Sequence, residues 1–89
     1  MKNRFLSGEG KISSSSGYLS TVNYNIEFRE AEPIQGSIRI VNGERGLSLH
    51  NNEDKLTLHL DAVRSLTVVI KTPIDLTDDS WLILVSNSN

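Results

Sequence analysis

The amino-acid sequence predicts an all-β fold, in which a small antiparallel meander of about seven strands forms a partly open β-barrel. Over most of the chain, apolar residues alternate with polar ones, which is typical of strands with one face in a core and one in solvent. Turn-forming residues interrupt this alternation roughly every 8–12 residues, and no stretch shows the apolar spacing of a long helix. A two-sheet β-sandwich is the alternative arrangement of the same strands.

The length of 89 residues predicts one β domain, 1–89, with loosely ordered ends at 1–9 and 86–89. A short strand is expected at 11–13. It leads into a serine-rich turn and then into the longest strand, at 18–29, where every second residue is apolar over much of its length. Residues 30–33 end that strand, where Pro33 has no N–H to give to a central ladder.

The middle of the chain is expected to continue as strands and turns. Residues 34–40 alternate again, and the Asn-Gly pair at 42–43 is a strong turn signal, since both residues tolerate positive φ. A strand is then expected at 47–50 and a four-residue turn at 51–54. This turn leads into a central β-hairpin at 56–70.

The central hairpin constrains its own geometry, because its core-facing apolar residues fall at even positions and must face one core. That arrangement requires an odd-length connection, which we expect to be a three- or five-residue loop, or a bulge, between Asp61 and Ser65. The Asp61 carboxylate can accept backbone N–H groups within such a turn. The expected pairs are Leu60 with Leu66, Leu58 with Val68, and Leu56 with Ile70.

The last expected strand, at 81–85, is apolar at every position, which predicts that both of its faces are covered. The residues expected on the core faces of all the strands are Val22, Tyr24, Ile26, Phe28, Ile34, Ile38, Ile40, Leu47, Leu49, Leu56, Leu58, Leu60, Leu66, Val68, Ile70, Trp81, Ile83 and Val85.

The composition argues against several classes of function. Nine basic and eleven acidic residues give a net charge of −2, and the basic residues are scattered, so nucleic-acid binding is not favoured. The chain has no cysteine, which excludes a disulfide and a cysteine-rich zinc site. It also has no apolar run near the roughly 20 residues that span a membrane. We therefore expect a cytoplasmic protein with no membrane contact.

The titratable residues do not predict catalysis or metal binding. In the expected register, His50 and His59 lie four strand positions apart, roughly 13 Å, which is too far to share a metal. His59 and Asp61 share a strand face and could touch, but no nucleophile or acid–base pattern accompanies them. Asp78 and Asp79 lack the ligand spacing of a calcium loop. We expect no enzyme activity, no metal and no cofactor.

Two kinds of binding surface remain. Val69, Leu82 and Leu84 are expected on the outer face of neighbouring strands, where they would form an apolar patch that monomers seldom leave bare. Residues 5–6 or 74–76 could cover this patch; otherwise a second copy or another protein would, which predicts a protein-interaction module or a homodimer. The alternative is a barrel that binds an oligosaccharide or single-stranded nucleic acid through a polar face. The candidate residues for that face are Arg39, His59 and Arg64.

Overall fold

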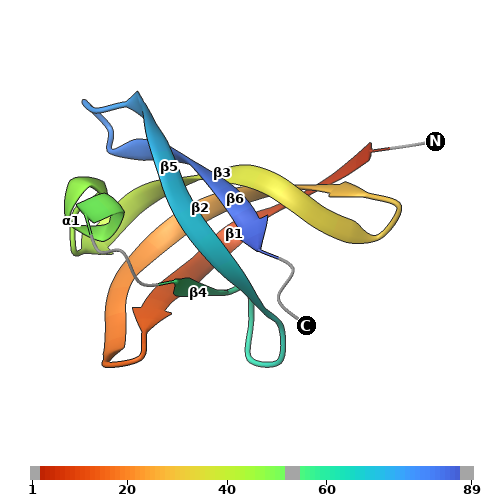
Figure 1. Ribbon diagram of the computed structural model, residues 1–89, viewed down its shortest axis with the longest axis horizontal. Helices are drawn as coiled ribbons and strands as arrows, with labels where there is room; N and C mark the ends of the chain where they lie inside the picture. The colour runs from red at the N-terminus through yellow and green to blue at the C-terminus, as the bar shows by residue number, and fades with distance from the viewer. Residues whose placement is uncertain (1–2, 52–54, 87–89) are drawn as a thin grey trace.

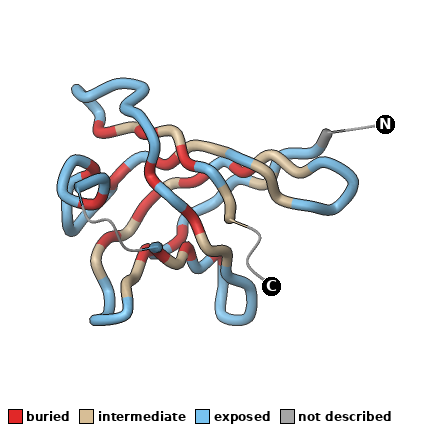
Figure 2. The backbone as a smooth tube through the Cα atoms, viewed as in Figure 1, coloured by how far each residue is buried: buried red, intermediate tan, exposed pale blue. Residues whose placement is uncertain are grey.

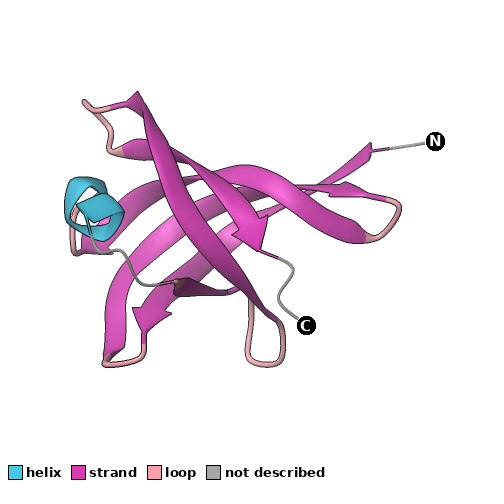
Figure 3. Ribbon diagram, in the orientation of Figure 1, coloured by secondary structure: helices cyan, strands magenta, loops and turns pink. Residues whose placement is uncertain are grey.

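The computed structural model describes residues 3–51 and 55–86, and these form a closed barrel of six antiparallel strands with one short helix (Figures 1 and 3). The all-β antiparallel meander barrel is confirmed. The structure has one strand fewer than the expected seven. The strands are β1 (Asn3–Ser14), β2 (Gly17–Arg29), β3 (Glu32–Gly43), β4 (Leu56–His59), β5 (Ser65–Asp75) and β6 (Ser80–Ser86), and the helix is α1 (Gly46–Asn51).

Two three-stranded meanders make up the barrel, and their order around it is β1-β2-β3-β6-β5-β4. The chain passes from the first meander to the second through α1. One seam joins β3 to β6, where residues 35–39 pair with 80–84. The other seam is shorter and joins residues 11–13 of β1 to 57–59 of β4. The short seam closes the ring, so none of the described strands is an edge along its whole length.

The core fills the inside of the barrel (Figure 2), because alternate residues of every strand point inward. Most predicted core residues are confirmed as buried, and Phe28, Leu66 and Val85 are partly buried against them. Ile34 is only half-buried and does not belong to the cluster, while Leu47 is exposed. The sequence did not predict Ile12, which is fully buried. The buried apolar residues are Ile12, Val22, Tyr24, Ile26, Ile38, Ile40, Leu49, Leu56, Leu58, Leu60, Val68, Ile70, Trp81 and Ile83.

The prediction of a strand at 47–50 was wrong, because this segment lies in α1. In the helix, Gly46 and Leu49 are three residues apart and both face the barrel, whereas Leu47 points to solvent. Two leucines at alternate positions are too few to distinguish a strand from one turn of helix. The pairing of His50 with Lys55 therefore does not occur in a ladder, and the expected turn at 51–54 lies mostly outside the described residues.

The central hairpin is present with the odd-length connection that the alternation predicts, but its register differs by two residues. Leu58 pairs with Leu66 and Leu56 with Val68, which leaves a five-residue loop at 60–64. Leu60 is not free to pair with Leu66, since it turns into the core and its N–H donates to the Arg64 carbonyl at 2.9 Å. The Asp61 carboxylate accepts the N–H groups of Val63 and Arg64 at 2.9 and 2.8 Å, as the turn chemistry predicts.

Strand β1 extends well beyond the short strand expected at 11–13, because residues 3–9 pair with β2. Gly8 and Gly10 lie against the Tyr24 ring, and a Cβ at Gly10 would contact both the ring, at 3.1 Å, and the His59 carbonyl. The two glycines therefore allow the backbone of β1 to approach the Tyr24 ring closely.

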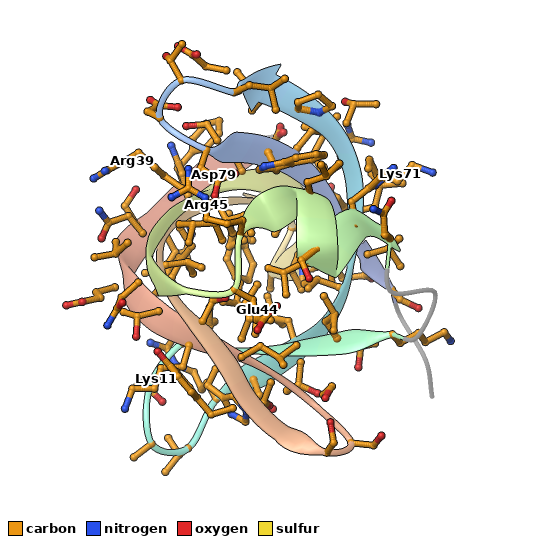
Figure 4. The ribbon with its side chains drawn as sticks, turned by 90° about the vertical axis from the view of Figure 1, so that its left-hand side faces the viewer. Lys11, Arg39, Glu44, Arg45, Lys71 and Asp79 are labelled. Atoms are coloured by element: carbon orange, nitrogen blue, oxygen red, sulfur yellow. The ribbon has the colours of Figure 1, made fainter. Side chains whose placement is uncertain are left out.

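The two ends of the barrel differ. The helix α1 lies across one end (Figure 1), which we call the plugged end, and Figure 4 looks onto that end. The opposite end, which we call the mouth, carries the loop at 60–64 and the β2–β3 turn, and this turn extends past the ring (Figure 1). The inward-facing apolar side chains at the mouth remain partly exposed. They are Leu6, Phe28, Leu66 and Val85.

Candidate functional site

The outer face of β5 and β6 carries three apolar side chains, Val69, Leu82 and Leu84, which together we call the outer patch. Val69 lies opposite Leu84 in the antiparallel ladder, and each side chain is 39% exposed. Leu82 is two residues from Leu84 on the same face of β6 and is half-buried. The structure thus brings together all three residues that the sequence assigned to an interaction surface.

The barrel does not need these side chains for its core. The opposite face of the same strands already supplies Val68, Ile70 and Ile83, which are at most 5% exposed. Because successive side chains of a strand point to opposite faces, the apolar residues at 69, 82 and 84 stand on the solvent side of a filled sheet. The solvent face of a sheet in a single-layer barrel normally carries polar side chains.

The two segments that could cover the outer patch leave most of their apolar side chains exposed. Phe5 is 65% exposed, and Leu6 beside it turns inward to pack on the core. At the end of β5 and in the turn that follows it, Ile74 is 57% and Leu76 is 63% exposed. Val69 and Leu84 therefore keep an accessible apolar surface within the described part of the chain.

The three residues of the alternative polar face do not lie together. Arg39 is on β3 and points away from the barrel (Figure 4), whereas His59 ends β4 and Arg64 belongs to the loop that follows it. Strands β3 and β4 are opposite each other, since two strands separate them in either direction around the ring. A single ligand of modest size cannot touch Arg39 and the other two at once.

His59 and Arg64 each have a partner within the protein. The His59 Nε2 atom lies 2.8 Å from the Ser13 hydroxyl, a contact that adds to the short β1–β4 seam. The Arg64 Nε–H donates to the Asp61 carboxylate at 2.9 Å. The backbone N–H groups of Val63 and Arg64, and to a smaller extent this guanidinium, hold the pKa of Asp61 below its ordinary value of 3.8. These contacts order the β4–β5 hairpin.

Arg39 lines a concavity on the described surface, with a volume of about 370 Å³. The side chains of Asn23 and Asn25 on β2 and Ser37 on β3 share this concavity. Asn23 lies opposite Arg39, and Asn25 lies opposite Ser37, so the four form a polar rectangle on the outer surface. Solvated polar side chains of this kind are what the outer face of a half-buried strand ordinarily carries.

A hydrogen-bonded cluster centred on the buried Asp79 carboxylate fixes the plugged end (Figure 4). Asp79 is 6% exposed and adopts φ 59°, and its carboxylate accepts the Gly46 N–H at 3.1 and 3.2 Å and the Trp81 Nε1–H at 2.7 Å. The Arg45 Nε atom lies 3.1 Å from it. Gly46 packs so closely on Trp81 that a Cβ would overlap the indole nitrogen. This cluster was not predicted, because its only signal in the sequence is an aspartate two residues before the one tryptophan.

The other titratable candidates also have structural partners. His50 stacks on Trp81 with ring centroids 5.4 Å apart, and its Nδ1 lies 3.2 Å from the Ile70 carbonyl oxygen. Asp78 accepts a hydrogen bond from the Ser80 hydroxyl, so the two adjacent aspartates face different partners. Among the residues that the structure describes, no group of three or more histidines and carboxylates lies close enough to hold a metal ion.

Comparison with known proteins gives no relative for this barrel. No family model, no curated protein and no solved structure matches the chain. Across the described residues, no helix has the length and apolar character needed to cross a membrane.

Proposed function

We propose that the chain is a small non-catalytic β-barrel module that acts through protein–protein contact or self-association, with the outer patch as its contact surface. One observation carries this proposal. Val69 and Leu84 form an exposed apolar cross-strand pair on the solvent side of a sheet whose inner side is already filled. Apolar residues in that position cost solubility and add nothing to the barrel core, so they are best explained by a surface that is covered in use.

The surroundings of the pair fit a contact surface with an apolar centre and a polar rim. Toward β3, Leu84 lies opposite Gln35 and Leu82 lies opposite Ser37, both of which are polar. Glu27 accepts a hydrogen bond from the Gln35 amide at 3.0 Å, which orders the rim beside the patch. An apolar centre surrounded by hydrogen-bonding residues is the usual anatomy of a protein interface. The proposal includes a cytoplasmic location, with which the absence of cysteine is compatible.

The test is the solution mass of the chain, measured by light scattering over a roughly hundredfold range of concentration, in the wild type and in variants. Leu82→Asp with Leu84→Asp is expected to convert a dimer to a monomer. If the wild type is monomeric, the same variant is expected to lose the proteins that the wild type retains from a lysate. Unchanged mass together with unchanged retention would overturn the proposal.

Two further variants keep this test clear. Val69→Lys with Leu84→Glu replaces the apolar pair by an opposite-charge cross-strand pair, which a β-ladder accommodates, so loss of association with retained folding assigns the effect to the surface. Leu47→Asp with Val63→Asp is the matched control. It also adds two carboxylates at exposed apolar positions, 58% and 88% exposed, but it leaves the outer patch intact. The control is expected to associate like the wild type.

A further inference from the structure

The mouth of the barrel contains a small cavity that joins apolar and cationic side chains. Its volume is about 260 Å³, and it is lined by Arg4, Phe5, Leu6, Phe28 and Arg64. Arg4 lies opposite Phe28 on the β1–β2 ladder and two residues before Leu6, so all three belong to the inward face of the sheet. Arg64 approaches from the loop at 60–64, far from β1 in sequence. The mouth of a β-barrel is a recurrent place for ligand sites.

The two arginines differ from most of the charged side chains that the barrel carries on its outer face, because they stand beside apolar surface. Among the described residues, Arg4 has no hydrogen-bond or ion-pair partner. Arg64 uses its Nε–H to bind Asp61, which leaves the terminal N–H groups of its guanidinium available. With Asp61 counted, the site has a net positive charge. A guanidinium presents its N–H groups as a planar fork that matches a carboxylate.

The size and floor of the cavity limit what it can hold. Leu6 and Phe28 are partly buried against the core and form an apolar floor, and the exposed ring of Phe5 stands at the rim. Below them the barrel is filled by side chains that are fully buried, including Ile26 and Ile83, so a long acyl chain has no channel to enter. A volume of about 260 Å³ suits a ligand with one ring or one apolar side chain.

From this combination we infer that the mouth binds a compact apolar carboxylate, with the carboxylate between Arg4 and Arg64 and the apolar body on Leu6 and Phe28. This site goes beyond the proposed contact surface and does not depend on it. The same chemistry could come from a free small acid or from the C-terminal residue of a peptide whose last side chain is apolar. The experiment separates these two sources.

The experiment is an NMR titration of the full chain with 3-phenylpropionate, up to roughly 10 mM, since small ligands of this kind bind with millimolar affinity at best. Saturable shifts at the backbone amides of Arg4, Leu6, Phe28 and Arg64 are expected. The neutral amide of the same acid is expected to bind at least roughly tenfold more weakly, because it cannot form the charge-assisted pairs. Acetate, which lacks the apolar body, is also expected to bind more weakly than 3-phenylpropionate.

The peptide arm uses Gly-Gly-Phe with a free or an amidated C-terminus. Tighter binding of the free peptide than of 3-phenylpropionate assigns the site to a chain terminus, and weaker binding assigns it to a free acid. Shifts that do not saturate, or equal binding of acid and amide, overturn the inference.

Variants tie the binding to the mouth. Arg4→Gln and Arg64→Gln are each expected to weaken binding of 3-phenylpropionate roughly fivefold or more, and neither removes a buried side chain. Arg39→Gln is the matched control, since it removes a guanidinium from the outer face of β3, and it is expected to bind like the wild type. The Leu82→Asp, Leu84→Asp variant is also expected to retain binding, which distinguishes failure of this site from failure of the outer patch. Equal affinity in the wild type and in the Arg4 and Arg64 variants would overturn the inference.

Discussion

The plugged end and the mouth of the barrel are built on opposite principles. At the plugged end, the Asp79 carboxylate is buried and receives hydrogen bonds from two separate segments, Gly46 and Trp81. At the mouth, the inward-facing side chains of Leu66 and Val85 are only partly buried, and the Asp61 carboxylate in the loop at 60–64 is exposed. This small barrel therefore concentrates specific, hard-to-replace contacts at one end, while the other end keeps accessible apolar and cationic surface.

The largest effect is expected from Asp79→Ala. The change leaves the buried Gly46 N–H and the Trp81 Nε1–H without an acceptor, and it places alanine at φ 59°, which favours glycine or asparagine. We expect the free energy of unfolding to fall by about 2–4 kcal/mol, out of a total of roughly 4–13 kcal/mol for a chain of this length. Urea denaturation monitored by Trp81 fluorescence measures the change.

Two neighbouring variants sharpen this measurement. Asp79→Asn keeps one acceptor oxygen and tolerates positive φ, so its loss is expected to lie between those of the wild type and Asp79→Ala. Asp78→Ala removes the adjacent, exposed carboxylate, and we expect a change within about 0.5 kcal/mol. If Asp79→Ala costs no more than Asp78→Ala, the buried cluster does not fix the plugged end.

A matched pair of leucines compares the two ends directly. Leu49 in α1 is 2% exposed, whereas Leu66 at the mouth is only partly buried. We expect Leu49→Ala to lower the free energy of unfolding by about 2–4 kcal/mol. Leu66→Ala is expected to lower it by about 1 kcal/mol, because folding buries less of the apolar area of a side chain at the mouth. Both are measured by the same urea titration. An equal or larger loss for Leu66→Ala would remove the contrast between the ends.

The same contrast explains how much of the molecule could be predicted from its sequence. Alternation identified most of the strand residues and most of the core, because burial on one face is a local, periodic signal. The Leu58–Leu66 register was not predictable in that way, since it depends on where Leu60 turns inward. The helix at 46–51 was not predictable either, since it depends on the Asp79 carboxylate, 33 residues from Gly46. Long-range polar contacts leave no periodic trace in a sequence.

The candidate surfaces divide along the same line. The three residues of the outer patch were found together because adjacent strands and a shared face follow from alternation. Arg39 was wrongly grouped with His59 and Arg64, because alternation does not give the order of strands around the barrel, which places β3 opposite β4. Arg4 was not considered as a site residue, because its place at the mouth depends on β1 continuing through residues 3–9.

The smallest effect concerns pH at the mouth. The backbone N–H groups of Val63 and Arg64, and then the Arg64 guanidinium, lower the pKa of Asp61 from 3.8. A carboxylate with a lowered folded-state pKa stabilises the loop at pH values above the unfolded-state pKa, and this contribution is lost as the pH falls through the folded-state pKa. A titration of the Asp61 carboxyl carbon by NMR is expected to give a midpoint below 3.8. The loop at 60–64 is expected to lose amide protection over the same acidic range.

Arg64→Gln separates the causes of this shift. Because the backbone bonds contribute first and the guanidinium contributes less, the pKa of Asp61 is expected to rise only part of the way toward 3.8 in this variant. Asp75, the last residue of β5, is the matched group, since its pKa is lowered chiefly by the Thr77 hydroxyl. Thr77→Val is therefore expected to raise the pKa of Asp75 and leave that of Asp61 unchanged. A midpoint for Asp61 at or above 3.8 in the wild type would show that the loop does not hold this carboxylate in solution. Arg64 would then not be held by Asp61 in the position on which the mouth site depends.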